Sequence, residues 1–90
     1  MYAIRPTTQF NRDLKRAEKR GCNIDILTDV IKKLASGERL EEKYRDHSLK
    51  GQFLGCRECH LTPDWLLIYE IEKNELILHL IRTGSHSELF

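Results

Sequence analysis

The sequence predicts an α+β fold, in which a hairpin of two helices packs on one face of a small antiparallel sheet. Two observations support this prediction. Apolar residues recur with the 3.6-residue period of helices before about residue 36 and with the two-residue period of strands after residue 48. The 90 residues are 40% hydrophobic and 32% charged, which is typical of a globular protein. We therefore expect residues 1–90 to form one domain.

The chain begins with a predicted short strand and a helix. Apolar and polar residues alternate over Tyr2–Arg5, and Pro6 ends the strand because it has no N–H to donate to a neighbouring strand. This strand can lie at the edge or the centre of the sheet. A helix is predicted over Thr8–Arg20, with Thr7 or Thr8 as its cap and Gly21 as its end. Its apolar positions are Phe10, Leu14 and Ala17.

A second amphipathic helix follows after a short turn. Asn23 or Asp25 can cap it, and Gly37 ends it. Its apolar positions follow the i, i+3, i+4 rule and are Leu27, Val30, Ile31, Leu34 and Ala35. Residues 38–48 are charged and lack periodicity, so we expect a connecting loop.

Four strands are predicted in the second half of the chain. Short turns at Gly55, at residues 62–64 and at residues 73–74 separate them, so an antiparallel meander is expected. The predicted strands are Leu49–Leu54, Cys56–Leu61, Trp65–Glu72 and Leu76–Arg82.

Both faces of the last two predicted strands are apolar, whereas the helix hairpin can cover only one face. An apolar patch left open on a small protein usually marks a partner surface. The alternative is that loops or self-association cover this face, and the pattern alone favours neither.

The composition also bears on the compartment. No apolar run approaches the roughly 20 residues that a membrane-spanning helix needs, so no membrane association is expected. The first ten residues lack the apolar core of a signal peptide. We therefore expect a cytoplasmic protein whose three cysteines are free thiols.

Basic residues concentrate near the N-terminus, where only Asp13 and Glu18 oppose them. Such a strip is either a solvated helix face or a phosphate-binding surface, and the first is the commoner case. The basic residues are Arg5, Arg12, Lys15, Arg16, Lys19 and Arg20.

Three of the four histidines lie beside predicted loops or turns, and these three are the candidates for catalysis. The meander can bring them to one rim of the sheet together with an acidic and a basic side chain. Imidazoles titrate near neutral pH, so neighbouring histidines can act as acid and base without a metal. His79 lies inside a strand and is expected to be structural. The residues expected on the rim are His47, His60, Asp64, Arg82 and His86.

Residues 56–60, Cys-Arg-Glu-Cys-His, also match the attachment motif of c-type haem. On a strand, however, Cys56 and Cys59 would point to opposite faces about 10 Å apart, too far to bond one haem edge. A zinc site formed by these cysteines and histidines is harder to exclude, although such sites usually need a turn between the two cysteines.

Three segments carry a family resemblance: RDHSLKG, then RECHLTPDWLLIY, then RTGSHSELF at the C-terminus. Together with the preceding helix hairpin, they resemble the YafQ branch of the RelE-type bacterial toxins along essentially the whole chain. The resemblance implies a RelE-like toxin fold and a type II toxin that needs no cofactor. It further implies cleavage of mRNA in the ribosomal A site, neutralisation by a cognate antitoxin, and a toxin that is monomeric alone.

The resemblance also assigns residues. It implies that the catalytic residues are His47, His60, Asp64 and His86, and that Arg82, Trp65 and Phe90 contact the RNA. Glu58 is a weaker candidate, and core packing is the alternative for Trp65. The basic helix becomes a candidate contact with ribosomal RNA and the open apolar face a candidate antitoxin seat. Two other functions remain open: a non-catalytic RNA- or ribosome-binding module, and a zinc-dependent hydrolase.

Overall fold

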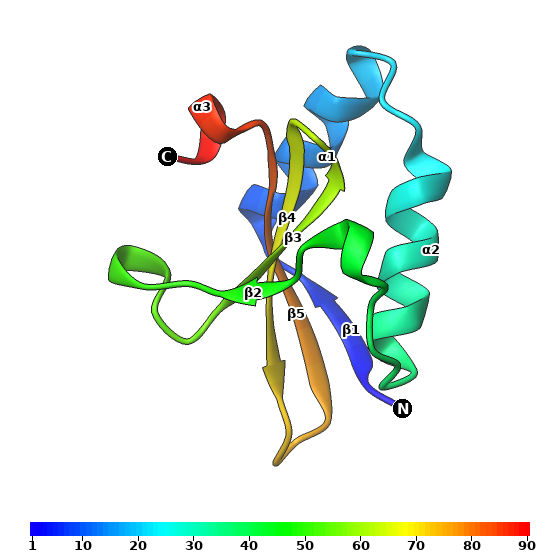
Figure 1. The fold of residues 1–90 in the computed structure, drawn as a ribbon, viewed down its shortest axis with the longest axis vertical. Coiled ribbons are helices and arrows are strands. Elements are labelled where there is room, and N and C mark those ends of the chain that lie inside the picture. Colours follow the sequence, from blue (N-terminus) through cyan, green and yellow to red (C-terminus); the bar gives the residue numbers. More distant parts are fainter.

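The structure is a computed structural model that describes all 90 residues. It contains a five-stranded sheet in the order β1-β5-β4-β3-β2, with two long helices, which confirms the α+β prediction (Figure 1). The helices are α1 (Thr8–Lys19), α2 (Ile24–Ala35) and α3 (His86–Leu89), and short 3₁₀ helices span Glu42–Tyr44 (η1) and Gly51–Phe53 (η2). The strands are β1 (Ala3–Pro6), β2 (His47–Ser48), β3 (Arg57–Thr62), β4 (Trp65–Glu72) and β5 (Ile77–Gly84).

The sheet is mixed because β1 pairs in parallel with its neighbour, whereas the other strands pair antiparallel. Strands β2 to β5 form the predicted antiparallel meander. Strand β1 pairs in parallel with β5, with Ala3 opposite Ile77, and therefore lies at the edge of the sheet. The termini of the chain are thus joined in one sheet.

The helix boundaries follow the expected caps. The side chain of Thr7 accepts a hydrogen bond from the backbone N–H of Phe10 at 2.9 Å, and that of Asn23 accepts one from the N–H of Asp25 at 3.1 Å. Gly21 and Gly37 follow the helices with φ of 80° and 83°, a conformation that glycine adopts at little cost.

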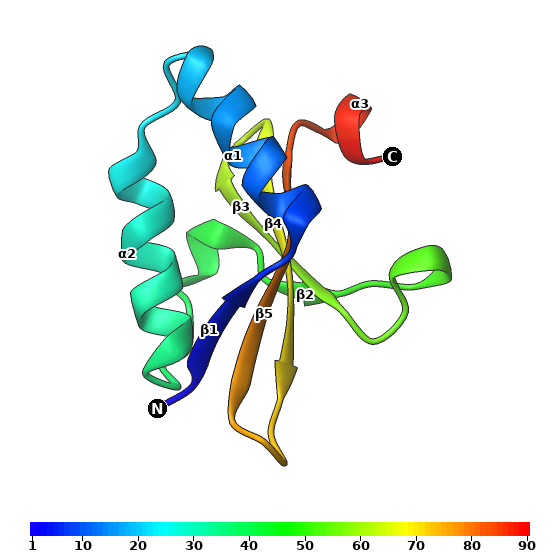
Figure 2. The same ribbon diagram turned by 180° about the vertical axis from the view of Figure 1, so that it is seen from behind.

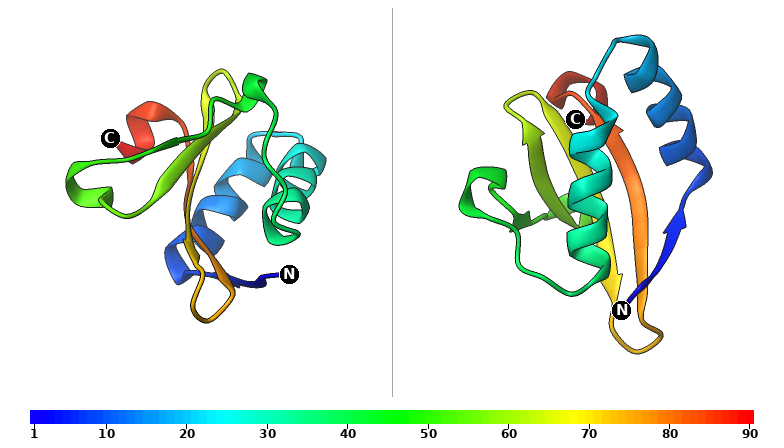
Figure 3. Two further views of the ribbon diagram at one scale, coloured as in Figure 1. Left: turned by 60° about the horizontal axis from the view of Figure 1, so that its bottom comes forward. Right: turned by 90° about the vertical axis from the view of Figure 1, so that its right-hand side faces the viewer.

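Helices α1 and α2 cover one face of the sheet, as Figures 1 and 2 show. The right panel of Figure 3 shows α2 lying across the strands and α1 beside the edge next to β5. The main core fills this space with 14 buried residues, among which Val30, Leu67 and Leu78 are fully enclosed. The residues that the two helices contribute to this core come from the apolar stripes predicted for them.

The apolar centre of the opposite face is also covered. Leu66 and Ile68 on this face are fully buried against Leu89 of α3, with Phe53 of η2 packed alongside. The left panel of Figure 3 shows α3 and the η2 segment on the side of the sheet away from the long helices. Of the two possibilities for this face, the open apolar patch is therefore wrong and cover by the chain itself is correct, because the C-terminal helix and the segment before β3 lie over it.

The strand predicted over Leu49–Leu54 is also wrong. Strand β2 is only two residues long, and the chain then turns through η2 before β3. Gly51 has a φ of 68°, which is incompatible with a continuous strand, whereas the φ of 92° at Gly55 fits the turn predicted there. Leu49 and Phe53 of this segment pack against the second small core instead, and Leu54 is exposed.

Trp65 does not lie on the surface as an RNA contact. Its side chain belongs to the main core and the residue is 5% exposed. A base cannot stack on it in this structure, so the alternative of core packing is the correct one.

Candidate active site

The register of the strands places the candidate residues in a row. His47 of β2 lies opposite Glu58 of β3, Glu58 opposite Ile68 of β4, and Ile68 opposite Arg82 of β5. Residues opposite each other in a sheet share a face, so His47, Glu58 and Arg82 all belong to the face that α3 covers in part. Adjacent strands lie about 4.8 Å apart, which puts the backbones of Glu58 and Arg82 about 10 Å apart.

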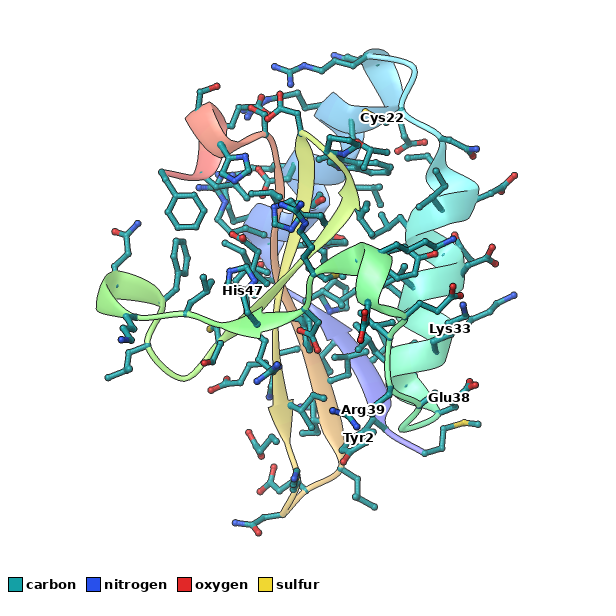
Figure 4. All side chains as sticks on the ribbon, in the orientation of Figure 1. Tyr2, Cys22, Lys33, Glu38, Arg39 and His47 are labelled. Atoms are coloured by element: carbon teal, nitrogen blue, oxygen red, sulfur yellow. The ribbon has the colours of Figure 1, made fainter.

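Three imidazole rings converge beside this row. The ring centroids of His47 and His60 are 6.1 Å apart, and those of His60 and His86 are 5.6 Å apart. His47 leaves β2 on the side of the sheet that carries α3 (Figure 4). His86 is the first residue of α3, and the ring of His60, near the end of β3, is the one that neighbours both of the others. The predicted convergence of these histidines is therefore what the fold produces.

His47 is held by two contacts. Its Nδ1–H donates to the backbone carbonyl of Arg45 at 2.7 Å, and its Nε2 lies 3.3 Å from Oε1 of Glu58. Because a carbonyl only accepts hydrogen bonds, Nδ1 carries a proton and the ring orientation is fixed. Arg45 adopts a left-handed conformation with φ of 50°, which turns its carbonyl toward the ring.

Glu58 is buried at the centre of the site. The residue is 3% exposed, and its Oε2 has no hydrogen-bond partner in the structure. The adjacent Nδ1 of His60 is buried and unpartnered as well. Burying an unpaired polar atom costs about 1–3 kcal/mol, so these two atoms are open to a hydrogen bond from a ligand.

Asp64 and Phe90 lie on either side of His86. Oδ1 of Asp64 is 3.5 Å from Nδ1 of His86, and both side chains are exposed, so this contact orients the ring only weakly. The ring centroid of Phe90 is 6.5 Å from that of His86, and Phe90 packs edge-on against Phe53 at 5.6 Å. Phe90 remains 60% exposed and offers a free aromatic face beside the histidines.

Arg82 is anchored by a buried carboxylate. Its Nε and Nη2 donate to the two oxygens of Asp13 at 3.0 and 2.9 Å, and the backbone N–H of Thr83 donates to the same carboxylate at 3.2 Å. Burial raises the pKa of Asp13, but the hydrogen bonds from Arg82, Gln9 and Thr83 outweigh it and hold this pKa below its ordinary value. Helix α1 therefore sets the position of the arginine.

Helix α3 is anchored to α1 as well. Glu88 forms a capping box with Ser85 and pairs with Arg20 at 2.6 Å and Arg16 at 3.3 Å. The hydrogen bond from the backbone of Ser85, aided by Arg20, lowers the pKa of Glu88. Part of the basic strip predicted on α1 thus holds the helix that begins with His86.

Comparisons with known proteins agree with this arrangement. The family described as "Bacterial toxin of type II toxin-antitoxin system, YafQ" matches residues 2–90. The chain belongs to the YafQ toxin family.

Individual YafQ-like relatives cover nearly the whole chain. The mRNA interferase toxin YafQ of Escherichia coli is 36% identical over 83 residues, which are 91% of this chain and 88% of that protein. The crystal structure of a metal-bound toxin from Helicobacter pylori is 48% identical over the full length of both chains, with a TM-score of 0.94. YafQ in the E. coli DinJ–YafQ complex is 34% identical and covers 100% of this chain and 99% of its own, with a TM-score of 0.91.

One part of this YafQ-type site has the chemistry of a metal site. Glu58, His60 and His86 offer ligand atoms that all lie within 4.8 Å of one another. One carboxylate and two imidazoles suit Zn²⁺ or Cu²⁺, and a cation bound there would act as a Lewis acid toward a phosphate oxygen. It would also occupy ring nitrogens that proton transfer needs.

The cysteines do not form a second metal or haem site. Cys59 belongs to the main core and Cys56 packs with the small core on the opposite face of the sheet. Burial raises the pKa of Cys59 to about 12, and burial also raises that of Cys56, so both remain thiols at neutral pH. The match to the haem motif is therefore coincidental.

The sequence also held a signal for Asp13 that the prediction did not use. Asp13 falls on the apolar stripe of α1 between Phe10 and Ala17, where a charge is buried on folding and needs a partner. The sequence indicated Glu58 only weakly, whereas its burial and its contact with His47 make it a central residue of the candidate site. No periodic pattern in the sequence indicated a role for Lys43 of η1 or for Arg45 just after it.

Proposed function

We propose that this YafQ-family toxin cleaves messenger RNA in the ribosomal A site, in the cytoplasm, by metal-independent acid/base catalysis. The observation that carries the proposal is the convergence of His47, His60 and His86 beside the buried carboxylate of Glu58. The E. coli relative is named as an mRNA interferase, which supports it.

The reaction uses the 2′-hydroxyl of the RNA itself. A base removes the proton of this hydroxyl, O2′ forms a bond to phosphorus, and the bond from phosphorus to O5′ breaks. An acid gives a proton to the departing O5′. The products are a 2′,3′-cyclic phosphate and a 5′-hydroxyl, and the extra negative charge in the transition state needs cationic partners.

Each step has a suitable side chain. We assign His86 as the acid because it is exposed on a short helix at the rim, where it can reach the departing oxygen. His60, between the other two rings, is the base, and Asp64 orients His86. His47, fixed by Glu58, faces the phosphate together with Arg82.

Phe90 holds the RNA. Its exposed ring next to His86 can stack on an unpaired base, as aromatic side chains do in single-strand recognition. This contact would place the scissile phosphate over the histidines.

The proposal includes a cognate antitoxin. The DinJ–YafQ complex is a structural neighbour with the same fold over the whole chain. An antitoxin that covers the face with the histidines would block RNA binding, and we expect the free toxin to be monomeric.

Cleavage is expected to require the ribosome. A chain this small offers an open surface and cannot itself bend free RNA into in-line geometry, whereas the ribosome presents an ordered message. The test compares cut sites in a translated message with those in the same RNA without ribosomes. Equal rates on both would contradict the ribosome requirement, and no cleavage of either would favour the non-catalytic binding module.

The effect of metal on the cleavage rate distinguishes the two mechanisms. A metal-dependent enzyme loses activity when its metal is removed, whereas a metal-independent one keeps it. Because imidazoles are proposed to move the protons, cleavage of a translated message should survive when the toxin is first treated with EDTA and then dialysed free of it, and Zn²⁺ should inhibit by binding Glu58, His60 and His86. The measurement is the initial rate of the EDTA-treated and dialysed toxin in a translation mixture that keeps its Mg²⁺, and the initial rate across a Zn²⁺ titration. Loss of activity with EDTA and recovery with Zn²⁺ would instead identify a zinc-dependent hydrolase.

A further inference from the structure

We propose that the cavity beside His60 and His86 binds the nucleotide next to the cleaved bond, with its base on an apolar floor and its phosphates held by Lys43 and Arg45. This inference rests on the proposed function and deepens it, because it assigns a nucleotide subsite that begins at His60 and His86 and extends beyond the catalytic residues.

The cavity is continuous with the site. It has a volume of about 640 Å³, and His60 and His86 form one of its walls. Sites for small molecules commonly measure 300–1,000 Å³, so the cavity is large enough for a nucleotide. A ligand bound here touches the same two rings that are proposed to transfer protons.

The floor of the cavity is suited to a flat base. Ile26 of α2, Leu61 of β3 and Pro63 of the β3–β4 turn supply apolar surface, and Tyr44 of η1 lines the cavity as well. Single-stranded RNA presents unstacked bases that proteins bind against such surfaces. Thr62 offers a hydroxyl on the same wall for a base edge.

The remaining wall is basic. Lys43 and Arg45 both line the cavity and are exposed. Arg45 makes no ion pair, and Lys43 has only Glu41 at 4.0 Å and the ring of Tyr44. Charges without partners beside a catalytic cluster suit a polyanion, and the acidic residues that line the site elsewhere are not on this wall.

The backbone of Arg45 links the cavity to the catalytic row. Its carbonyl accepts from Nδ1 of His47, and its left-handed φ of 50° sends its side chain toward the cavity while the carbonyl faces the ring. A phosphate held by Arg45 is thereby fixed relative to His47.

The two sides of the histidine cluster thus differ. Phe53 and Phe90 form an aromatic pair on the side of α3 and η2, and the cavity opens toward η1 and the start of α2. Figure 1 shows α3 and the segment after β2 on one side of β3 and β4, and α2 with the segment before β2 on the other. An RNA strand that runs across the histidines would place one base at Phe90 and the next in the cavity.

The test measures binding without cleavage. The probe is a fluorescein-labelled RNA pentanucleotide that is 2′-O-methylated throughout, so it lacks the attacking hydroxyl, and binding is followed by anisotropy. The double variant Lys43→Gln/Arg45→Gln should bind at least 10-fold more weakly. The slope of log Kd against log salt should fall by about 1.4, since each phosphate contact with single strands contributes about 0.7.

The matched control removes the same charge elsewhere. Lys32→Gln/Arg39→Gln changes two exposed basic residues, at the far end of α2 from Ile26 and just beyond it (Figure 4 labels Arg39). It should bind the probe within two-fold of the unaltered protein, and unchanged melting temperatures would show that both variants fold.

The outcomes separate this inference from the proposed function. Equal affinity of the two double variants for the RNA probe would overturn the nucleotide subsite even if cleavage is intact. The same holds if the unaltered protein binds a Glu-rich peptide through Lys43 and Arg45 but does not bind the RNA probe. Weaker RNA binding by Lys43→Gln/Arg45→Gln alone would support the subsite even if the protein failed to cut a translated message.

Discussion

Replacing His86 with glutamine is expected to slow cleavage of a translated message by a factor of about 10² to 10⁴, the usual cost of losing a positioned acid. Glutamine can keep a hydrogen bond but cannot transfer a proton to the departing O5′. The ring of His86 is about half exposed, and its only ion-pair contact is Asp64 at 3.5 Å. The free energy of unfolding of the variant should therefore differ from that of the unaltered protein by no more than about 0.5 kcal/mol.

His79→Gln provides the matched control. His79 lies on β5, where its Nε2 contacts Glu72 at 3.2 Å, and it takes no part in the cluster of three rings. The two variants should differ in cleavage rate and resemble each other in melting temperature. If folded His86→Gln cut at a near-normal rate, His86 would not be the acid, and the proton would have to come from His60 or Asp64.

Periodicity predicted most of the fold because most elements bury one regular face. The two long helices and the strands Trp65–Glu72 and Leu76–Arg82 were placed to within about two residues. The strand predicted over Leu49–Leu54 is wrong because Leu49 and Phe53 pack on a second small core from a turn, and their spacing resembles the pattern of a strand. Helix α3 was missed because it is only four residues long.

The site was predictable only in part, since it depends on register. A meander brings segments near each other, but only the pairing of His47 with Glu58 and of Glu58 with Ile68 shows which side chains share a face. The burial of Trp65 depends on which face the helices cover, which alternation alone cannot give when both faces are apolar. The cavity beside Arg45 depends on a left-handed residue in a loop, for which the sequence holds no periodic signal.

Asp13→Asn is expected to lower the free energy of unfolding by about 3 kcal/mol, at the lower end of the range for breaking a buried ion pair, because Arg82 is about a quarter exposed. For a chain of this length, that corresponds to a fall in melting temperature of more than about 10 °C. The amide leaves the Arg82 guanidinium without its bidentate partner and weakens the bond from the N–H of Thr83. Gln9→Ala, which removes only the bond from Gln9 at 3.0 Å, should cost far less.

The pH dependence of this effect has a definite sign. The folded protein holds the pKa of Asp13 below its ordinary value, so the carboxylate stabilises the fold above the pKa of the unfolded chain. That contribution disappears as the pH falls through the folded pKa, when Asp13 becomes protonated and resembles the asparagine. The gap in melting temperature between the unaltered protein and Asp13→Asn should thus be full near pH 7 and narrow below about pH 4. A gap that stays constant from pH 7 to pH 2.5 would mean that the ion pair with Arg82 does not anchor β5 to α1.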